Sequence, residues 1–472
     1  MENYDNLKEL FTRLEYYAID NLFWTLFYSG CGLPYFFSEK EISYLNSFGD
    51  EDKEFIENLM PIRCLYKKAK AVFSEAPHEI LNAGKYVWDF ESFDKEISVQ
   101  TQVFAVLSMM QLLNYNKFNN KLFKYVSNRQ IKNFIDFLTA YMRNKDGLFV
   151  DVVDKTRYLN EELKIKQQKD LRLINQFFAL EAMLSYSKFV EINNNQIYNS
   201  EANSIFKYIF ENFNFVLDLT TREVCLIASS LYRASSMAQD DAMITSMSEL
   251  IALCCAEIES RIKINGEIEK SSNNYSPSSL VTHFRAISAL LEGYKQTRIE
   301  KFKHSAKRIA DFLIDLFDED IMLFNTFESE YKYTIRDISE IIKALLLLRD
   351  VLDDEMALEV LKKFVEASIE NSGIVQSVTE EKFKDDTKSL FSDVNLAPVF
   401  LRSFTFKRDL LSKYEVSSSV NLYYSVYASY LMLMSISALD KFLEEKKLAY
   451  NDDLNENLTV STTAEEDKIP DA

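Results

Sequence analysis

The chain contains three histidines, and only one lies where acid/base chemistry would be expected. His283 falls in the first turns of a strongly apolar helical stretch, and Arg285 follows two residues later. A helix places residues i and i+4 on one face but sets i and i+2 about 200° apart. We therefore expect His283 to line a cavity as an acid/base group or polar contact. Arg285 is expected to point toward a neighbouring helix or the rim and to brace a carboxylate. The alternative is a buried histidine that is hydrogen-bonded for packing alone.

Three aspartates could supply the paired carboxylates that cleave a glycosidic bond, one acting as acid and the other as base. Asp89 and Asp151 lie in expected loops, and Asp337 lies in the first turn of an apolar helical stretch. Trp88 precedes Asp89, and an indole beside a carboxylate suits stacking against a sugar ring. The alternatives are a core tryptophan that anchors a turn, and acids that cap helices or face solvent.

Further polar side chains occupy the first turns of other apolar stretches, namely Gln102, Gln176 and Glu340. Helix N-termini attract oxygen-rich or anionic groups through their free N–H groups and the helix dipole. Together with Trp88 and Arg285, these three are the candidate ligand-binding residues. Capping of the first turns is the alternative function for such side chains.

The sequence contains no HExxH, P-loop, GxGxxG or GxSxG pattern and no spacing typical of metal ligands. We therefore predict neither a metal site nor a cofactor. Five cysteines are irregularly spaced without a CxxC pair, and we expect them to be reduced and mostly buried: Cys31, Cys64, Cys225, Cys254 and Cys255.

Composition excludes several classes of function. The net charge is −19 and no basic stripe offsets it, which argues against nucleic-acid binding. No apolar run is long enough for membrane insertion, and the first residues lack the pattern of a secretory signal, so a cytoplasmic location is expected. Residues 451–472 hold seven acidic residues, one lysine and no aromatic residue, which predicts a disordered acidic tail.

Only 8 glycines and 6 prolines occur in 472 residues, which favours helices over turn-rich β architectures. A unit of roughly 55 to 60 residues recurs along the chain, as in stacked helical repeats. In each unit an amphipathic stretch, a turn with a few β-prone residues and a second helical stretch follow one another. Two of the turns are expected at Asn212-Phe-Asn-Phe-Val and at Glu319-Asp-Ile-Met-Leu-Phe, where Asn or Asp can adopt the left-handed conformation. The other turns are marked by glycines, namely Gly84, Gly147, Gly266 and Gly373.

Six stretches are the most apolar and are expected to be inner helices, over residues 97–115, 170–189, 222–234, 278–295, 335–352 and 420–439. Amphipathic stretches such as 301–317 and 355–369 carry apolar residues at i, i+3 and i+4 and are expected to pack outside them. Six apolar helices ringed by six amphipathic ones are what a closed solenoid requires, whereas an open superhelix needs capped ends.

One hairpin carries a resemblance to a known fold. The stretch Leu280-Val-Thr-His-Phe-Arg-Ala-Ile-Ser-Ala-Leu-Leu, followed by Phe302-Lys-His-Ser-Ala-Lys-Arg-Ile-Ala-Asp-Phe-Leu, resembles the hairpin of six-hairpin (α/α)6 toroids, which include glycosidases and sugar epimerases. The resemblance spans residues 65–442 and implies an all-α toroid domain over 61–450. Residues 1–60 are then an N-terminal helical extension packed on the toroid. The resemblance also implies that ligands enter a central funnel at the N-terminal ends of the inner helices.

The resemblance implies a protein that binds or processes a carbohydrate in this funnel, and a catalytic version would be glycosidase-like or sugar-isomerising. Sugar epimerases of this fold use more than one histidine, whereas only His283 is suitably placed here. A non-catalytic scaffold that binds a protein or peptide is the alternative, because the expected rim loops are poor in glycine and histidine. The aromatic content of 14% leaves a lipid- or isoprenoid-binding toroid as a third function.

Overall fold

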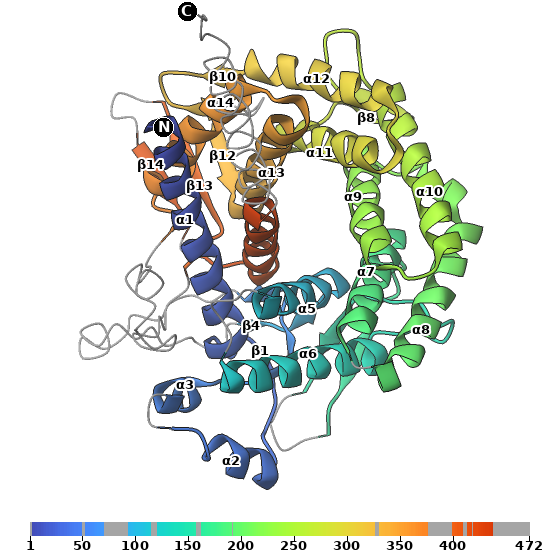
Figure 1. Cartoon of the computed structure of the whole chain (residues 1–472), viewed down its shortest axis with the longest axis vertical. Coiled ribbons are helices and arrows are strands. Elements are labelled where there is room, and N and C mark those ends of the chain that lie inside the picture. The colour runs from blue at the N-terminus through green and yellow to red at the C-terminus, as the bar shows by residue number, and fades with distance from the viewer. Residues whose placement is uncertain are drawn as a thin grey trace, which may run out of the picture.

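The computed structural model describes residues 2–49, 52–69, 93–114, 120–156, 162–190, 192–325, 330–375, 399–408, 413–417 and 419–437. They form a ring of helices in two layers, as the all-α toroid prediction requires (Figure 1). The inner layer consists of α5 (Val99–Asn114), α7 (Leu173–Phe189), α9 (Thr221–Met237), α11 (Leu280–Thr297), α13 (Ile335–Leu352) and the helix over 422–437, which is dark red in Figure 1. The outer layer consists of α1 (Glu2–Phe23), α6 (Lys121–Tyr141), α8 (Ile192–Glu211), α10 (Asp241–Ser260), α12 (Glu300–Ile314) and α14 (Glu355–Val365).

Burial explains why the two layers differ in sequence. Every residue of α7 from Ile174 to Ser187 is buried, so this inner helix is apolar around most of its circumference. In contrast, α12 buries one stripe that includes Phe302 and Ile309, and its other face is charged. From α5 to α13, each inner helix contacts the next one and packs on the outer helix that follows it in the chain. No helix in the described ranges is long and apolar enough to cross a membrane.

Two kinds of connection alternate around the ring. The turns from an inner to an outer helix are short, and left-handed residues end two of the helices: Arg298 after α11 and Asp353 after α13. The connections from an outer to an inner helix are longer and carry small antiparallel sheets beside the N-terminal ends of the inner helices. These sheets are β3–β4 (Lys68–Ala69, Phe93–Asp94), β5–β6–β7 (Glu96–Ile97, Val152–Asp154, Ile165–Gln167), β8–β9 (Glu269–Ser271, Asn274–Pro277), β10–β11 (Phe317–Asp318, Leu323–Phe324) and β12–β13–β14 (Tyr331–Thr334, Ser403–Lys407, Lys413–Val416).

The predicted glycine turns are present in these longer connections. Gly147, Gly266 and Gly373 have φ values of +79°, +92° and +76°, a conformation that side chains with a Cβ rarely adopt. Gly266 also lies so close to α12 that a Cβ would sit 2.5 Å from the carbonyl oxygen of Arg308. The fourth predicted glycine, Gly84, lies outside the described residues.

At the two remaining turns, neither Asn nor Asp takes the predicted left-handed conformation. Asn212 has a φ of −112°, because its side-chain nitrogen bonds the carbonyl of Tyr208 and the chain continues into the 3-10 turn Phe213–Val216. At the other turn the left-handed residue is Met322, with a φ of +56°, instead of Asp320.

Asn21 joins α1 to the last helix that the structure describes, over residues 422–437. Its amide nitrogen donates to the carbonyl of Ser425 at 3.3 Å and to the hydroxyl of Ser429 at 2.8 Å. Its amide oxygen accepts from the hydroxyl of Ser425 at 2.9 Å and from the backbone N–H of Phe400 at 3.3 Å. This fully buried asparagine therefore closes the ring between α1 and the helix over 422–437. The division of the chain at residue 60 stays a prediction.

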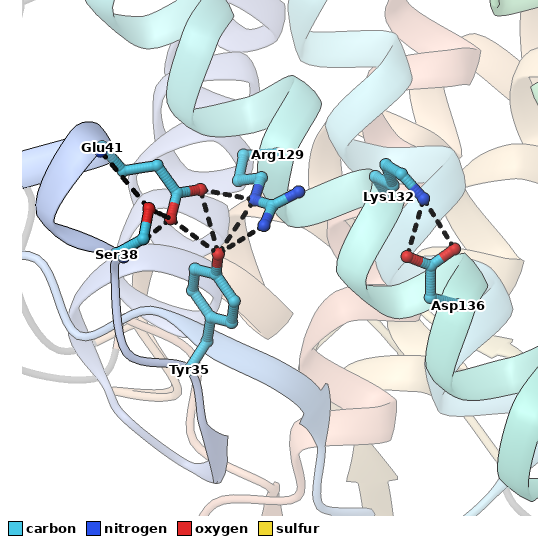
Figure 2. A network of polar contacts seen from close by, with 6 residues as sticks. All are labelled: Tyr35, Ser38, Glu41, Arg129, Lys132 and Asp136. Atoms are coloured by element: carbon cyan, nitrogen blue, oxygen red, sulfur yellow. Dashed lines mark hydrogen bonds and ion pairs between the residues drawn. The ribbon is translucent and has the colours of Figure 1, made fainter. Parts of the chain in front are cut away.

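The segment that follows α1 packs on the outer helix α6. It forms β1 (Gly32–Pro34), α2 (Glu39–Leu45), α3 (Lys53–Asn58) and β2 (Ile62–Leu65), with β1 antiparallel to β2. Figure 2 shows how this segment is fastened to α6: the hydroxyl of Tyr35 donates to Glu41 and accepts from Arg129, and Arg129 also pairs with Glu41 at 2.7 Å. Ser38 and Glu41 form the capping box of α2.

Candidate functional site

The centre of the ring holds charged and polar side chains that face one another from five inner helices. Arg285 of α11 donates from Nε to Glu340 of α13 at 2.8 Å, and the hydroxyl of Tyr427 donates to the same carboxylate at 2.6 Å. Lys343, one turn further along α13, pairs with Glu292 of α11 at 2.7 Å. We call the whole set the central network: Glu181, Ser229, Ser230, Arg233, Arg285, Glu292, Glu340, Lys343, Tyr427 and Tyr430.

The second half of the central network lies between α7 and α9. Arg233 donates from Nε and Nη2 to the two carboxylate oxygens of Glu181, at 2.6 and 2.9 Å. Ser230 donates to the same carboxylate at 2.7 Å, and Tyr430 donates to it at 3.4 Å. A bidentate arginine–carboxylate pair of this kind fixes both side chains in place. The network fills the middle of the ring, where the cavity among its side chains measures only about 10 Å³.

The carboxylate of Glu340 is held in its charged form. Burial alone would raise the pKa of Glu340, but the positive charges of Arg285, Arg336 and Lys343 and the hydrogen bond from Tyr427 lower it to about 2. Glu340 therefore cannot serve as a general acid near neutral pH. Glu181 and Glu292 are each paired with a buried base.

Three arginines converge on the N-terminal side of the central network. Arg336 lies in the first turn of α13, buried among aromatic rings, with its guanidinium carbon 5.2 Å from the ring centre of Tyr423 and 5.9 Å from that of Tyr424. Its Nε is buried without a hydrogen-bond partner. Arg222 lies at the start of α9 and is exposed to solvent at the ring end. Its pKa is lowered by partial desolvation of the guanidinium group and by the charges of Arg336 and Arg285. We call this set the arginine mouth: Arg222, Arg285, Arg336, Tyr423 and Tyr424.

Charge is unevenly distributed between this lumen and the rest of the protein. The arginine mouth and central network contain five basic side chains (Arg222, Arg233, Arg285, Arg336, Lys343) but only three carboxylates (Glu181, Glu292, Glu340). The chain as a whole carries a net charge of −19. The lumen is thus a positive region inside an acidic protein, and the excess lies at the N-terminal ends of the inner helices.

Three sequence-predicted residues perform one structural role, which the sequence did not reveal. Gln102, Gln176 and His283 are each the fourth residue of an inner helix. Gln102 bonds both the N–H and the C=O of Leu65, at 2.9 and 2.7 Å, and Gln176 bonds those of Phe149, at 3.0 and 2.8 Å. These side chains clamp the preceding extended segment onto the inner helix.

His283 is the clamp of α11. Its Nε2 accepts from the backbone N–H of Ile268 at 3.0 Å, and Nδ1 lies 3.0 Å from the carbonyl of Ser279. The ring packs against Phe312 of the outer helix α12, with ring centres 5.5 Å apart. The predicted orientation of His283 is therefore wrong, because its ring faces the outer layer, whereas Arg285 reaches the neighbouring helix α13 as predicted. Arg285 does brace a carboxylate, that of Glu340.

Of the predicted catalytic aspartates, Asp151 and Asp337 lie in the described residues, and each caps an inner helix. Asp151 caps α5, accepting from the backbone N–H of Val99 at 2.8 Å and from the side chain of Asn175 at 3.2 Å. Burial raises the pKa of Asp151, against the effect of the Val99 hydrogen bond. Asp337 forms the capping box of α13 with Thr334. Trp88 and Asp89 lie outside the described residues.

The prediction of buried, unpaired cysteines is confirmed for all five. Burial raises the pKa of Cys31 and Cys225 to about 12, so both are inert thiols at neutral pH. Within the described residues, no group of His, Cys, Asp or Glu is arranged to hold a metal ion.

Sequence reasoning missed most of the lumen, namely Glu181, Arg222, Arg233, Glu292, Arg336, Lys343, Tyr423, Tyr424, Tyr427 and Tyr430. A signal was present in the apolar helices. Arg336, Glu340 and Lys343 are spaced by four and three residues, which places them on one face of α13. A lone acid such as Glu181 inside a wholly buried stretch also requires a buried partner.

Comparison with known proteins shows the fold. No family model matches the sequence, and no curated protein matches it. Among solved structures, a D-mannose isomerase has a TM-score of 0.52 and 12% identity, covering 72% of this chain and 87% of that one. A cellobiose 2-epimerase from Spirochaeta thermophila DSM 6192 has a TM-score of 0.52 and 9% identity, covering 73% and 88%. The fold is that of the six-hairpin (α/α)6 toroids.

Proposed function

We propose that this toroid binds a carbohydrate that carries an anionic group, a carboxylate or a phosphate, at the arginine mouth. The observation that carries the proposal is the convergence of Arg222, Arg285 and Arg336 above a single carboxylate, Glu340. An anion in the mouth relieves the repulsion among the guanidinium groups and gives the buried Nε of Arg336 an acceptor.

The carbohydrate part of the proposal rests on the fold and on the aromatic rings. Both similar structures are enzymes named for sugars, a mannose isomerase and a cellobiose epimerase. Tyr423 and Tyr424 border Arg336, and tyrosine offers a ring face together with a hydroxyl. The hydroxyl of Tyr423 is buried without a partner, so it is free to bond a ligand oxygen.

The state of the carboxylates supports binding rather than cleavage. Glycoside hydrolysis requires one carboxyl group that is protonated and another that is charged. In the central network all three carboxylates are ion-paired, and the pKa of Glu340 is lowered to about 2. His283, the candidate acid/base group, is bonded to the backbone away from the lumen.

Isothermal titration calorimetry with glucose, glucuronic acid, glucose 6-phosphate and inorganic phosphate tests the proposal. We expect the two anionic sugars to bind more tightly than glucose, and binding to weaken when ionic strength rises from about 0.05 to about 0.5 M. Arg222→Gln should lower the affinity for the anionic sugars about tenfold, since a hydrogen bond to a charged group contributes about 1.5–3 kcal/mol.

Lys207→Gln is the matched control, because Lys207 is a highly exposed base on the outer helix α8. It should leave affinity unchanged, and both variants should keep the melting temperature. Equal affinity of wild type and Arg222→Gln for every sugar would overturn the site. If inorganic phosphate binds as tightly as glucose 6-phosphate, the mouth holds an anion and the carbohydrate part of the proposal is wrong.

A further inference from the structure

A hollow lies at the end of the lumen opposite the arginine mouth, beside the short turns. It is formed where the C-terminal ends of α5, α7 and α9 meet the helix over 422–437, and its volume is about 450 Å³. Pockets for small organic ligands measure about 300–1,000 Å³. We call it the C-terminal pocket. The central network separates it from the arginine mouth.

The walls of the C-terminal pocket are apolar. Leu107 and Met110 come from α5, Phe189 from α7, Met237 from α9 and Met434 from the last helix. Methionine side chains are unbranched and polarisable, so a wall rich in them adapts to ligands of different outline. These walls favour a ligand with an apolar body.

The polar groups of the pocket provide hydrogen-bond donors at its floor and rim. At the floor, Glu181 receives hydrogen bonds from Arg233, Ser230 and Tyr430, so its carboxylate is already neutralised. Arg233 uses Nε and Nη2 in this pair, and its Nη1 is the donor that Glu181 does not engage. At the rim, the exposed ammonium group of Lys188 bridges α7 to α9 by donating to the carbonyl of Ser236 at 3.3 Å.

We propose that the C-terminal pocket binds a small amphipathic acid, with its apolar body against Met110, Met237 and Met434 and its anionic head at Lys188. Among the described residues that line the pocket, Glu181 is the one carboxylate, and it is ion-paired with Arg233. The site is independent of the arginine mouth, since no residue is shared between the two.

Fluorescence titration with 11-(dansylamino)undecanoic acid, followed by displacement with decanoate or decanol, tests this inference. We expect saturable binding at one site per chain and stronger displacement by decanoate than by decanol. Lys188→Gln should lower the affinity for decanoate about tenfold and leave the affinity for decanol unchanged, because it removes one charge-assisted hydrogen bond.

Met237→Glu places an acid in the apolar wall and should abolish binding of the probe. Met237 is only partly buried, so this change is compatible with folding. The matched control is Met356→Glu on the outer helix α14, where Met356 is 52% exposed, and it should bind like wild type. Retained secondary structure and melting temperature exclude unfolding as the cause.

Unchanged probe binding in Met237→Glu would show that the probe does not bind in the C-terminal pocket. Equal displacement by decanol and decanoate would show that the pocket does not recognise an anionic head group. Arg222→Gln provides the separation from the proposed carbohydrate function. It should weaken anionic sugars and leave the amphipathic acid unaffected, so either proposal can fail without the other.

Discussion

The imidazole of His283 bonds the backbone N–H of Ile268 at 3.0 Å, in the position where α5 and α7 use a glutamine to bond Leu65 and Phe149. The same clamp is therefore made by two kinds of side chain. A histidine in this place needs to be neutral, because only an unprotonated Nε2 can accept the hydrogen bond.

We expect His283→Gln to retain most of the stability, whereas His283→Leu should lose about 1–3 kcal/mol, the cost of an unsatisfied buried N–H. Burial lowers the pKa of His283 below 6.5, so its contribution is present above pH 6.5 and is lost as the pH falls through the lowered pKa. Urea unfolding of wild type and both variants from about pH 7 to about pH 5 measures this. A glutamine variant as unstable as the leucine variant would contradict the clamp.

Glu340→Gln should cost about 3–5 kcal/mol, because it leaves the buried charge of Arg285 without its partner. The matched control is Asp136→Asn, which breaks the pair of Lys132 and Asp136 on the surface of α6 (Figure 2) and should cost less than about 1 kcal/mol. Because the pKa of Glu340 is lowered from 4.5 to about 2, its contribution to stability is present above pH 4.5 and lost towards pH 2. Similar losses in the two variants would show that the central network is not a stabilising unit.

The stability of the Asp151→Asn variant should increase relative to that of the wild type as the pH rises. The pKa of Asp151 is raised by burial, so its contribution to stability is full below the unfolded value of 3.8 and is lost as the pH rises through the raised value. Asparagine can still accept the hydrogen bond from Val99 and does not ionise. Chemical unfolding from about pH 4 to about pH 8 tests the sign, and a difference that is independent of pH would show that Asp151 does not titrate there.

Gly266→Ala should destabilise the protein severely. The residue has a φ of +92°, and a Cβ there would lie 2.5 Å from the carbonyl oxygen of Arg308, so both conformation and contact oppose alanine. Gly49→Ala is the control, since a Cβ at Gly49 meets no atom within 4 Å. Thermal unfolding should separate the two variants, and an equal effect would mean that α12 moves away without cost.

The helices could be predicted because burial around the ring imposes a period on the sequence. The inner helix predicted over 335–352 is α13, Ile335–Leu352, and the others differ by a few residues at their ends. Helix rotation could not be predicted from the same pattern. In α11, apolar residues occur on all sides, so hydrophobicity does not show which face meets the lumen. The clamp between His283 and Ile268, a tertiary contact, fixes that rotation.

The candidate site was only partly predictable for a related reason. Arg285 and Glu340 were singled out separately as polar residues in apolar first turns, but their pairing depends on two helices that meet across the lumen. Glutamine in a first turn suggested ligand binding, because sequence does not show that an extended strand lies beside it. In the structure, Gln102 bonds the backbone of Leu65, and Gln176 bonds the backbone of Phe149.

The bonds of Asn21 also determine when the ring can be completed during synthesis. Asn21 and its partner Ser425 are separated by 404 residues, so a ribosome working at about 5–20 residues per second needs roughly 20 to 80 seconds between them. During that interval α1 has left the ribosome while the helix against which it closes has not been translated. The nascent chain thus passes through an open arc with two unpaired edges, and the last helix to be made converts it into a ring.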